Sequence, residues 1–329
     1  MVEPMNETGS AETGSASSSD TSGAGPTTSG PERRCGFIAV VGAPNAGKST
    51  LVNALVGTKI AIVSRKVQTT RVPVRGIAIE GPAQLVFIDT PGLFAPRRRL
   101  DRAMVDAAAS AASDADVVAL VIDAAKGLDD EAEAILARLQ PLPSPRVLVL
   151  NKIDRLTKKD ALLALSADIN ARLAFTTTFM ISAESGSGVA ALRSWLAAAV
   201  PVGPWHYPED EITDTTERAT AAEVTRERIY DLLHEELPYQ TTVETTAFKE
   251  LRDGSVRIEQ TVFVERDSQK RIVLGEKGRT VKQISSEARA ELTRMFERPV
   301  HLFLFVKVRE GWENDPERYR EMGLDFPKE

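Results

Sequence analysis

The stretch "VVGAPNAGKSTLVNALVG" at residues 40–57 constrains the fold more than any other part of the chain. A continuous apolar run at 37–41 predicts a buried strand before it, and an apolar pattern with helical spacing follows it. From Gly42 to Ser49 the order Gly-x-x-x-x-Gly-Lys-Ser is that of a phosphate-binding loop, whose backbone N–H groups surround a phosphate chain at a helix N-terminus. The stretch therefore predicts a parallel α/β sheet that binds a nucleotide.

Different groups of this loop are expected to hold different parts of the nucleotide. Lys48 would reach the β- and γ-phosphates, and the Ser49 hydroxyl would bind Mg²⁺. Glycine allows backbone turns and close approaches that a Cβ would obstruct. The nucleotide-binding residues predicted in the loop are Gly42, Ala43, Pro44, Asn45, Ala46, Gly47, Lys48, Ser49 and Thr50.

Composition excludes several other classes of protein. The 329 residues carry a formal net charge of −6, so any surface that binds nucleic acid must be a local one. A single cysteine, Cys35, permits no intrachain disulfide, and three histidines make a zinc site unfavourable. No apolar run approaches the length of a membrane span, and residues 1–34 lack the apolar region of a secretory signal. We therefore expect a cytoplasmic protein.

The chain divides into a tail and two domains. Residues 1–34 are rich in Ser, Thr, Gly and Ala and predict a disordered tail. Residues 35–200 alternate apolar strands with helical patterns, which predicts a doubly wound α/β domain with a mostly parallel sheet and with ligand residues at the carboxyl ends of the strands. The strands are expected at 37–41, 74–79, 84–89, 117–123, 146–150 and 177–181, and the helices begin near 48, 100, 130, 158 and 189.

A second, smaller α+β domain is expected at 215–329, after a linker at 201–214 that is rich in proline and acid. Its elements are predicted as a helix at 216–237, strands at 242–251 and 256–265, a helical segment, the strand "VHLFLFVKV" and a short terminal helix.

Three further motifs select guanine as the base. Asp89-Thr90-Pro91-Gly92 follows one strand, and its carboxylate can hold Mg²⁺ through water while the glycine N–H faces the γ-phosphate. Asn151-Lys152-Ile153-Asp154 follows another, and its aspartate can accept the N1 and N2 hydrogens that adenine does not present. Ser182 and Ala183 follow the last strand, where a backbone N–H can bond guanine O6. Together these motifs predict a GTPase whose ligands are GTP or GDP and Mg²⁺.

With "SRKVQTTR" and "DTPG", the loop sequence "GxPNxGKSTLVNALVG" resembles the Era family of GTPases. The resemblance covers residues 36 to about 325. It implies a GTPase domain joined to a C-terminal KH domain, and a role in assembly of the bacterial small ribosomal subunit. The long tail and the acidic Glu276 depart from the family's pattern.

The resemblance also bears on hydrolysis. Related switch loops favour Thr70 over Thr69 as the threonine that completes the Mg²⁺ shell, with Ser49 and Asp89 as the other metal ligands. Leu93, included among the nucleotide-binding residues, stands where Ras-like proteins place the glutamine that orients water. In related GTPases an asparagine at the position of Asn45 helps to bind K⁺, although here it could simply shape the turn. Lys48, Thr70 and Gly92 are the predicted catalytic residues.

The second domain carries a Gly-x-x-Gly turn before a long helix. Such a turn lets an RNA backbone approach closely, and the order α-β-β-α-α-β is that of a type II KH domain. Residues 266–309 hold eleven Lys and Arg against five Asp and Glu, so positive charge gathers around the turn. The predicted RNA-binding residues are Gly275, Glu276, Lys277, Gly278, Arg279 and Lys282.

The expected function is a GTP-controlled switch that binds 16S rRNA near its 3′ end and promotes assembly of the 30S subunit, acting as a monomer. The alternative is a nucleotide-gated regulator of growth or division, peripherally bound to the inner face of the cell membrane, with RNA binding secondary.

Overall fold

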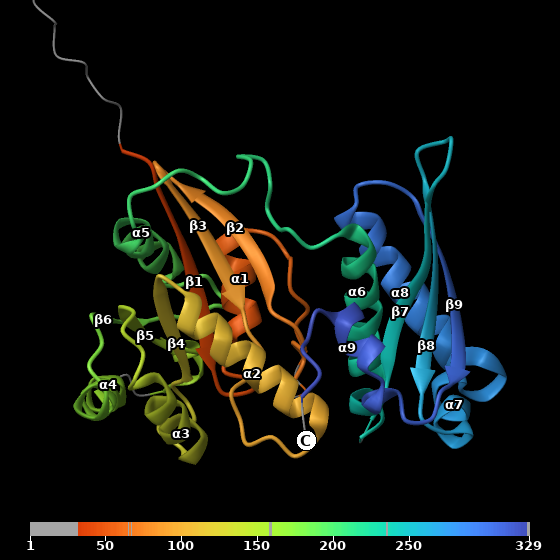
Figure 1. Cartoon of the computed structure of the whole chain (residues 1–329), viewed down its shortest axis with the longest axis horizontal. Coiled ribbons are helices and arrows are strands. Elements are labelled where there is room, and N and C mark those ends of the chain that lie inside the picture. The colour runs from red at the N-terminus through yellow and green to blue at the C-terminus, as the bar shows by residue number, and fades with distance from the viewer. Residues whose placement is uncertain (1–31, 65, 67, 158–159, 235, 328–329) are drawn as a thin grey trace, which may run out of the picture. The chain divides into compact units, whose positions relative to one another are not determined.

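The computed structural model describes residues 32–327 except 65, 67, 158, 159 and 235. The predicted tail lies almost wholly outside the described residues. Residues 33–327 belong to one compact unit that holds two separate sheets (Figure 1).

The first sheet has six strands in the order β2-β3-β1-β4-β5-β6, and only β2 runs antiparallel to its neighbour. Every residue of β3 and β4 is buried, which explains why these strands are continuous apolar runs in the sequence. The strands are β1 (Arg34–Gly42), β2 (Val74–Glu80), β3 (Ala83–Asp89), β4 (Val117–Asp123), β5 (Arg146–Asn151) and β6 (Thr177–Met180).

Helices cover both faces of this sheet. Side chains of α1 and α5 pack with Ile38 and Val40 on one face, while those of α2, α3 and α4 pack with Ala39 and Val41 on the other. The doubly wound, mostly parallel fold is therefore confirmed. Because β1 pairs with β3 on one side and β4 on the other, the loop after β1 lies where the chain changes direction across the sheet. The helices are α1 (Lys48–Val56), α2 (Arg99–Asp114), α3 (Asp130–Leu139), α4 (Asp160–Arg172) and α5 (Val189–Ala199).

The second sheet has three strands, with β7 antiparallel and β9 parallel to the central β8. Helices α6 and α8 pack on it through Ala221, Val224, Ala288 and Leu292. The elements follow the predicted order: α6 (Glu217–Leu232), β7 (Thr242–Glu250), β8 (Val256–Val264), α7 (Asp267–Leu274), α8 (Arg279–Met295), β9 (Val300–Val308) and α9 (Pro316–Met322).

The structure corrects the predicted end of the first helix of the second domain. The helix expected at 216–237 ends at Leu232, where Lys66 Nζ donates to the carbonyls of Tyr230 and Leu233 and so satisfies the helix end from outside. Leu237–Gln240 form a separate 3₁₀ turn. The predicted start of α4 at 158 falls on a residue that the structure does not describe.

The segment after α5 is held against the first sheet. Ile77 N donates to Ile212 O at 2.8 Å, and Arg75 pairs with Asp214 at 2.8 Å. Across the described part of the chain, no helix is both long and apolar enough to cross a bilayer.

Candidate functional site

The loop between β1 and α1 depends on its two glycines. Gly42 has φ 155°, and a Cβ there would lie 2.3 Å from the Val121 carbonyl oxygen. Gly47 has φ 96°, in the left-handed region, and a Cβ there would lie 2.3 Å from Asn151 Nδ2. Gly92 is equally confined, because its Cβ would meet Pro44 N at 2.9 Å. Close approach of backbone segments, rather than turn propensity alone, therefore requires glycine here.

Lys48 lies buried beneath the loop. Its Nζ donates to the carbonyls of Gly42 at 3.1 Å and Ala43 at 3.0 Å. Burial lowers the pKa of this amine to about 8, and the nearby Asp89 carboxylate partly opposes that shift. A phosphate group beside Lys48 would favour its charged form further, so the ammonium is placed to bind an anion.

Three oxygen groups converge beside Lys48. Ser49 Oγ donates to Asp89 Oδ2 at 2.7 Å, Thr70 Oγ1 donates to the same oxygen at 3.1 Å, and the two hydroxyls lie 3.0 Å apart. Asp89 is fully buried, and its Oδ1 has no partner among the described residues. Burial raises the pKa of Asp89 to about 6 despite the hydrogen bond from Ser49 and the charge of Lys48. A buried carboxylate with two hydroxyls fits Mg²⁺, which prefers oxygen ligands.

The structure also separates the two candidate threonines. Thr69 Oγ1 donates to the Lys66 carbonyl at 3.0 Å, whereas Thr70 Oγ1 faces Ser49 and Asp89. The geometry thus agrees with the preference for Thr70.

The guanine motifs are tied to the phosphate loop. Asn151 Nδ2 donates to Ala46 O at 3.0 Å, and its Oδ1 accepts from Ala183 N at 3.0 Å. Lys152 Nζ donates to Asn45 O at 2.5 Å and pairs with Asp123 at 2.7 Å. Asn151 therefore connects the phosphate loop to the Ser182-Ala183 segment, and Lys152 connects the loop to Asp123. Asp154 is exposed.

A cavity of about 950 Å³ joins these groups, which is large enough for a nucleotide. Of the predicted residues, those that line it are Pro44, Asn45, Gly47, Lys48, Ser49, Thr50, Thr70, Gly92, Asn151, Lys152, Asp154 and Ala183.

Other predicted nucleotide-binding residues lie behind the cavity wall. Leu93 is 2% exposed and packs in the core beneath the sheet, and the Thr90 hydroxyl donates to Val40 O at 2.8 Å. Both side chains are occupied inside the protein, and contact of Thr90 and Leu93 with the nucleotide stays a prediction. Gly42, Ala43, Ala46, Asp89, Pro91, Ile153 and Ser182 also lie outside the lining, Asp89 reaching the site through Ser49.

Sequence reasoning missed a part of the lining that comes from the second domain. Tyr230 and Asp231 of α6 line the cavity, although they follow the phosphate loop by more than 180 residues and no local motif marks them. The remaining unpredicted lining residues are Ile62, Val63, Ser64, Lys66, Gln68, Thr69, Asp123, Lys126, Arg155 and Glu184.

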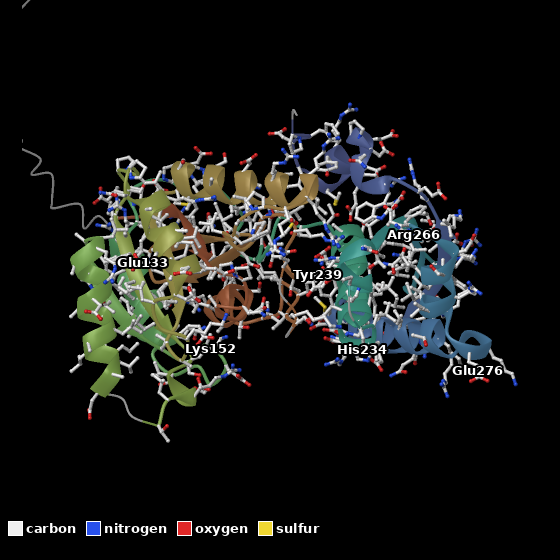
Figure 2. All side chains as sticks on the ribbon, turned by 90° about the horizontal axis from the view of Figure 1, so that it is seen from below. Glu133, Lys152, His234, Tyr239, Arg266 and Glu276 are labelled. Carbon is white, nitrogen blue, oxygen red and sulfur yellow. The ribbon has the colours of Figure 1, made fainter. Side chains whose placement is uncertain are left out.

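The Gly-x-x-Gly turn joins α7 to α8. A Cβ on Gly275 would lie 2.2 Å from Thr280 Oγ1, so this glycine is sterically required. Gly278 has φ 78° and open space where a Cβ would stand, so its requirement is conformational and leaves the outer face free. Figure 2 shows the Glu276 side chain directed outward at the end of this domain. The charged side chains of the turn are all exposed: Glu276, Lys277, Arg279 and Lys282.

Comparisons with known proteins identify the same two domains. A family model described as "50S ribosome-binding GTPase" matches residues 37–152, and a KH domain model matches residues 236–313. GTPase Era of Afipia carboxidovorans is 62% identical over 90% of this chain and 96% of its own length, and that of Brucella suis is 59% identical over 91% and 96%.

This chain belongs to the GTPase Era family.

Solved structures of Era proteins have the same fold. An Aquifex aeolicus Era variant bound to GDP and AlF₄⁻ superposes with a TM-score of 0.84 at 37% identity, over 88% of this chain and 99% of that one. Era in complex with MgGDPNP and nucleotides 1506–1542 of 16S ribosomal RNA gives a TM-score of 0.85, with the same identity and coverage. The Era-family chain is thus a GTPase with a C-terminal KH domain, and its cofactors are a guanine nucleotide and Mg²⁺.

Proposed function

We propose that this Era-family GTPase is a GTP-controlled switch that binds the 3′ end of 16S rRNA and promotes assembly of the 30S subunit. The observation that carries the proposal is the Gly275–Gly278 turn, with the exposed cations Lys277, Arg279 and Lys282 in and beside it, on the same compact unit as the nucleotide cavity. The Era complex with nucleotides 1506–1542 of 16S rRNA supports this choice of RNA. We assign RNA contact to Gly275, Glu276, Lys277, Gly278, Arg279 and Lys282.

Each nucleotide-site residue receives a separate role. Lys48 neutralises the transferred phosphoryl group, the Gly92 N–H faces it, and Asp154 reads the guanine base. Ser49 and Thr70 hold Mg²⁺ by their hydroxyls, and Asp89 binds both hydroxyls from below. Ala183 N is engaged by Asn151, which fixes the segment that faces guanine O6.

Hydrolysis in this site lacks the glutamine side chain that orients the attacking water in Ras-like GTPases. Leu93 stands at the position of the water-orienting glutamine of Ras-like proteins, and its side chain is buried in the core. Asn45 lines the cavity and has a left-handed backbone conformation with φ 62°, and its place within the phosphate-binding loop supports a role beside the phosphates. We propose that Asn45 helps to bind K⁺ against the phosphates.

Replacing Na⁺ by K⁺ at constant ionic strength is expected to accelerate GTP hydrolysis by about 10-fold, because the cation stabilises charge that develops in the transition state. Asn45→Ala should remove this difference while keeping GDP affinity. Phosphate release from wild-type protein and from Asn45→Ala is measured in the two salts. If the wild-type rates in K⁺ and Na⁺ are equal, Asn45 does not bind K⁺ and only shapes the loop.

Gly278→Asp is expected to weaken binding of an RNA oligonucleotide from the 3′ end of 16S rRNA by at least about 10-fold, because a carboxylate would face the phosphate backbone. The matched control is Gly254→Asp, in the β7–β8 turn, where φ is 81° and space for a Cβ is also open. Fluorescence anisotropy of the labelled oligonucleotide compares the variants, with GTP affinity as the check on folding. Wild-type RNA affinity in Gly278→Asp would contradict the KH-clamp assignment.

The proposal also includes the domain bounds, the oligomeric state, the cellular location and the partner. We propose domains at 35–200 and 215–329 on either side of the linker 201–214, a monomeric state and a cytoplasmic location. The membrane-associated alternative predicts sedimentation with anionic liposomes rather than with 30S subunits in the presence of a GTP analogue. We favour the ribosomal partner because the Era structure of the same fold is in complex with nucleotides 1506–1542 of 16S ribosomal RNA.

A further inference from the structure

The segment that carries Thr70 is bonded on both sides to the second domain. Arg226 of α6 donates from Nη2 to the carbonyl of Thr69, the residue before it. Arg71, the residue after it, donates to the carbonyls of Thr241 at 2.9 Å and Tyr239 at 3.2 Å, which follow α6. The two arginines thus cross between the domains in opposite directions, one on each side of Thr70.

Both arginines are buried, at 2% exposure for Arg226 and 5% for Arg71. Burying a guanidinium is costly unless hydrogen bonds and an opposing charge compensate it. Glu223 supplies that charge for Arg226 through Nε at 2.9 Å, and the Trp312 ring lies 5.8 Å from Arg71. These buried donors are directed at backbone carbonyls, which restricts the conformation of the chain on either side of Thr70.

Further bonds connect neighbouring parts of the same region to the second domain. Glu227 accepts from Val63 N at 2.7 Å and pairs with Lys59 at 2.6 Å. Lys59 also pairs with Glu291 of α8, the helix that begins directly after Gly278 of the RNA clamp. The region around Thr70 is therefore linked to α6 and, through Lys59, to α8, one of the two helices that flank the proposed RNA site.

We propose that Arg226 and Arg71 are positioning residues that hold the Thr70 hydroxyl at the Mg²⁺ site, so that the second domain sets how strongly the protein distinguishes GTP from GDP. The inference rests on the proposed role of Thr70. Because GTP with Mg²⁺ engages Thr70 and GDP does not require it, the bonds from α6 favour the GTP-bound form. By thermodynamic reciprocity, GTP in turn strengthens these interdomain bonds.

The test uses full-length protein and fluorescent analogues of GDP and GMP-PNP, each titrated with Mg²⁺ and with EDTA. For Arg226→Gln we expect GMP-PNP affinity in Mg²⁺ to fall about 5- to 10-fold, at the lower end of typical allosteric couplings, while GDP affinity stays within about twofold. Arg71→Gln should give the same pattern from the other side of the interface. Arg226→Lys, which keeps a donor for Thr69 O, should recover part of the loss.

The matched control is Arg218→Gln, on the same helix. Arg218 donates to the carbonyl of Thr245 in its own domain and so leaves the Thr70 segment untouched. We expect its ratio of GMP-PNP to GDP affinity to equal that of the wild type. An equal loss for both nucleotides in Arg226→Gln, no loss, or the same change in Arg218→Gln would overturn the inference.

Further measurements distinguish a misfolded variant, a wrong role for Thr70 and a wrong role for the two arginines. Thermal unfolding checks each variant, and if Arg226→Gln does not fold, Arg71→Gln decides the question. Wild-type protein whose GMP-PNP affinity does not depend on Mg²⁺, or Thr70→Ala whose GMP-PNP affinity in Mg²⁺ equals that of the wild type, would refute the proposed role of Thr70 itself. If these two behave as expected but the arginine variants bind like wild type, the positioning role alone is wrong.

Discussion

Lys48→Ala is expected to reduce single-turnover GTP hydrolysis by about 100- to 1,000-fold, the loss seen when one preorganised donor to transition-state charge is removed. The side chain is buried under the phosphate loop and donates to the carbonyls of Gly42 and Ala43, so we expect its ammonium to lie beside the phosphates. Phosphate release at saturating GTP measures the effect.

The pKa of Lys48, lowered by burial to about 8, sets a further expectation for the protein without nucleotide. A lysine whose folded-state pKa is below its unfolded value costs stability at pH values below that pKa, and this cost fades as pH rises from about 8 towards 10.5. Lys48→Ala should therefore remain folded at neutral pH, as thermal unfolding can verify. Lys249→Ala, an exposed lysine in the second domain, serves as the control for loss of charge. A folded Lys48→Ala protein with near wild-type turnover would refute the phosphate-loop assignment.

Asp154→Asn is expected to weaken GTP binding by at least about 100-fold and to give xanthosine triphosphate the higher affinity, because polar groups left unpaired in a base site discriminate strongly. In the proposed role the carboxylate would accept two guanine hydrogens, whereas an asparagine amide could donate to the 2-carbonyl of xanthine. Its exposed position in the cavity leaves it free to reach a base.

Competition titrations with GTP, XTP and ATP measure this change of preference. Asp160→Asn, which removes an exposed carboxylate from the start of α4, provides the control. If Asp154→Asn still prefers GTP, Asp154 does not recognise the base, and another residue of the cavity must do so.

The nucleotide-binding domain was predictable because its signals are local. A buried parallel strand must be apolar throughout, so β4 was predicted to the residue and the other five strands to within three residues at either end. The phosphate loop and the guanine motifs also follow strands directly, and parallel strands bring their carboxyl ends to one edge of a sheet. Their meeting in one cavity therefore follows from chain order.

Features that the sequence did not predict depend on contacts between residues that are distant in the chain. The helix expected to reach residue 237 ends at Leu232, since the backbone becomes extended at Leu233, and Lys66, distant in the chain, binds the carbonyls of Tyr230 and Leu233. Leu93 is predicted to contact the nucleotide from its place in a motif, and the motif alone did not indicate that its side chain packs into the core. A motif marks a position along the chain, but the packing of the sheet decides which way the side chain points.

The sequence by itself determined the family, the two folds and the chemistry of the phosphate and guanine motifs, since each rests on residues close together in the chain. Tertiary structure alone decided which hydroxyl, Thr70 or Thr69, faces Asp89, and that Tyr230 and Arg226 of the second domain approach the nucleotide region. The physical reason is that a hydrogen bond between side chain and backbone 157 residues apart leaves no periodicity or spacing in the sequence; it exists only once both domains have folded and docked.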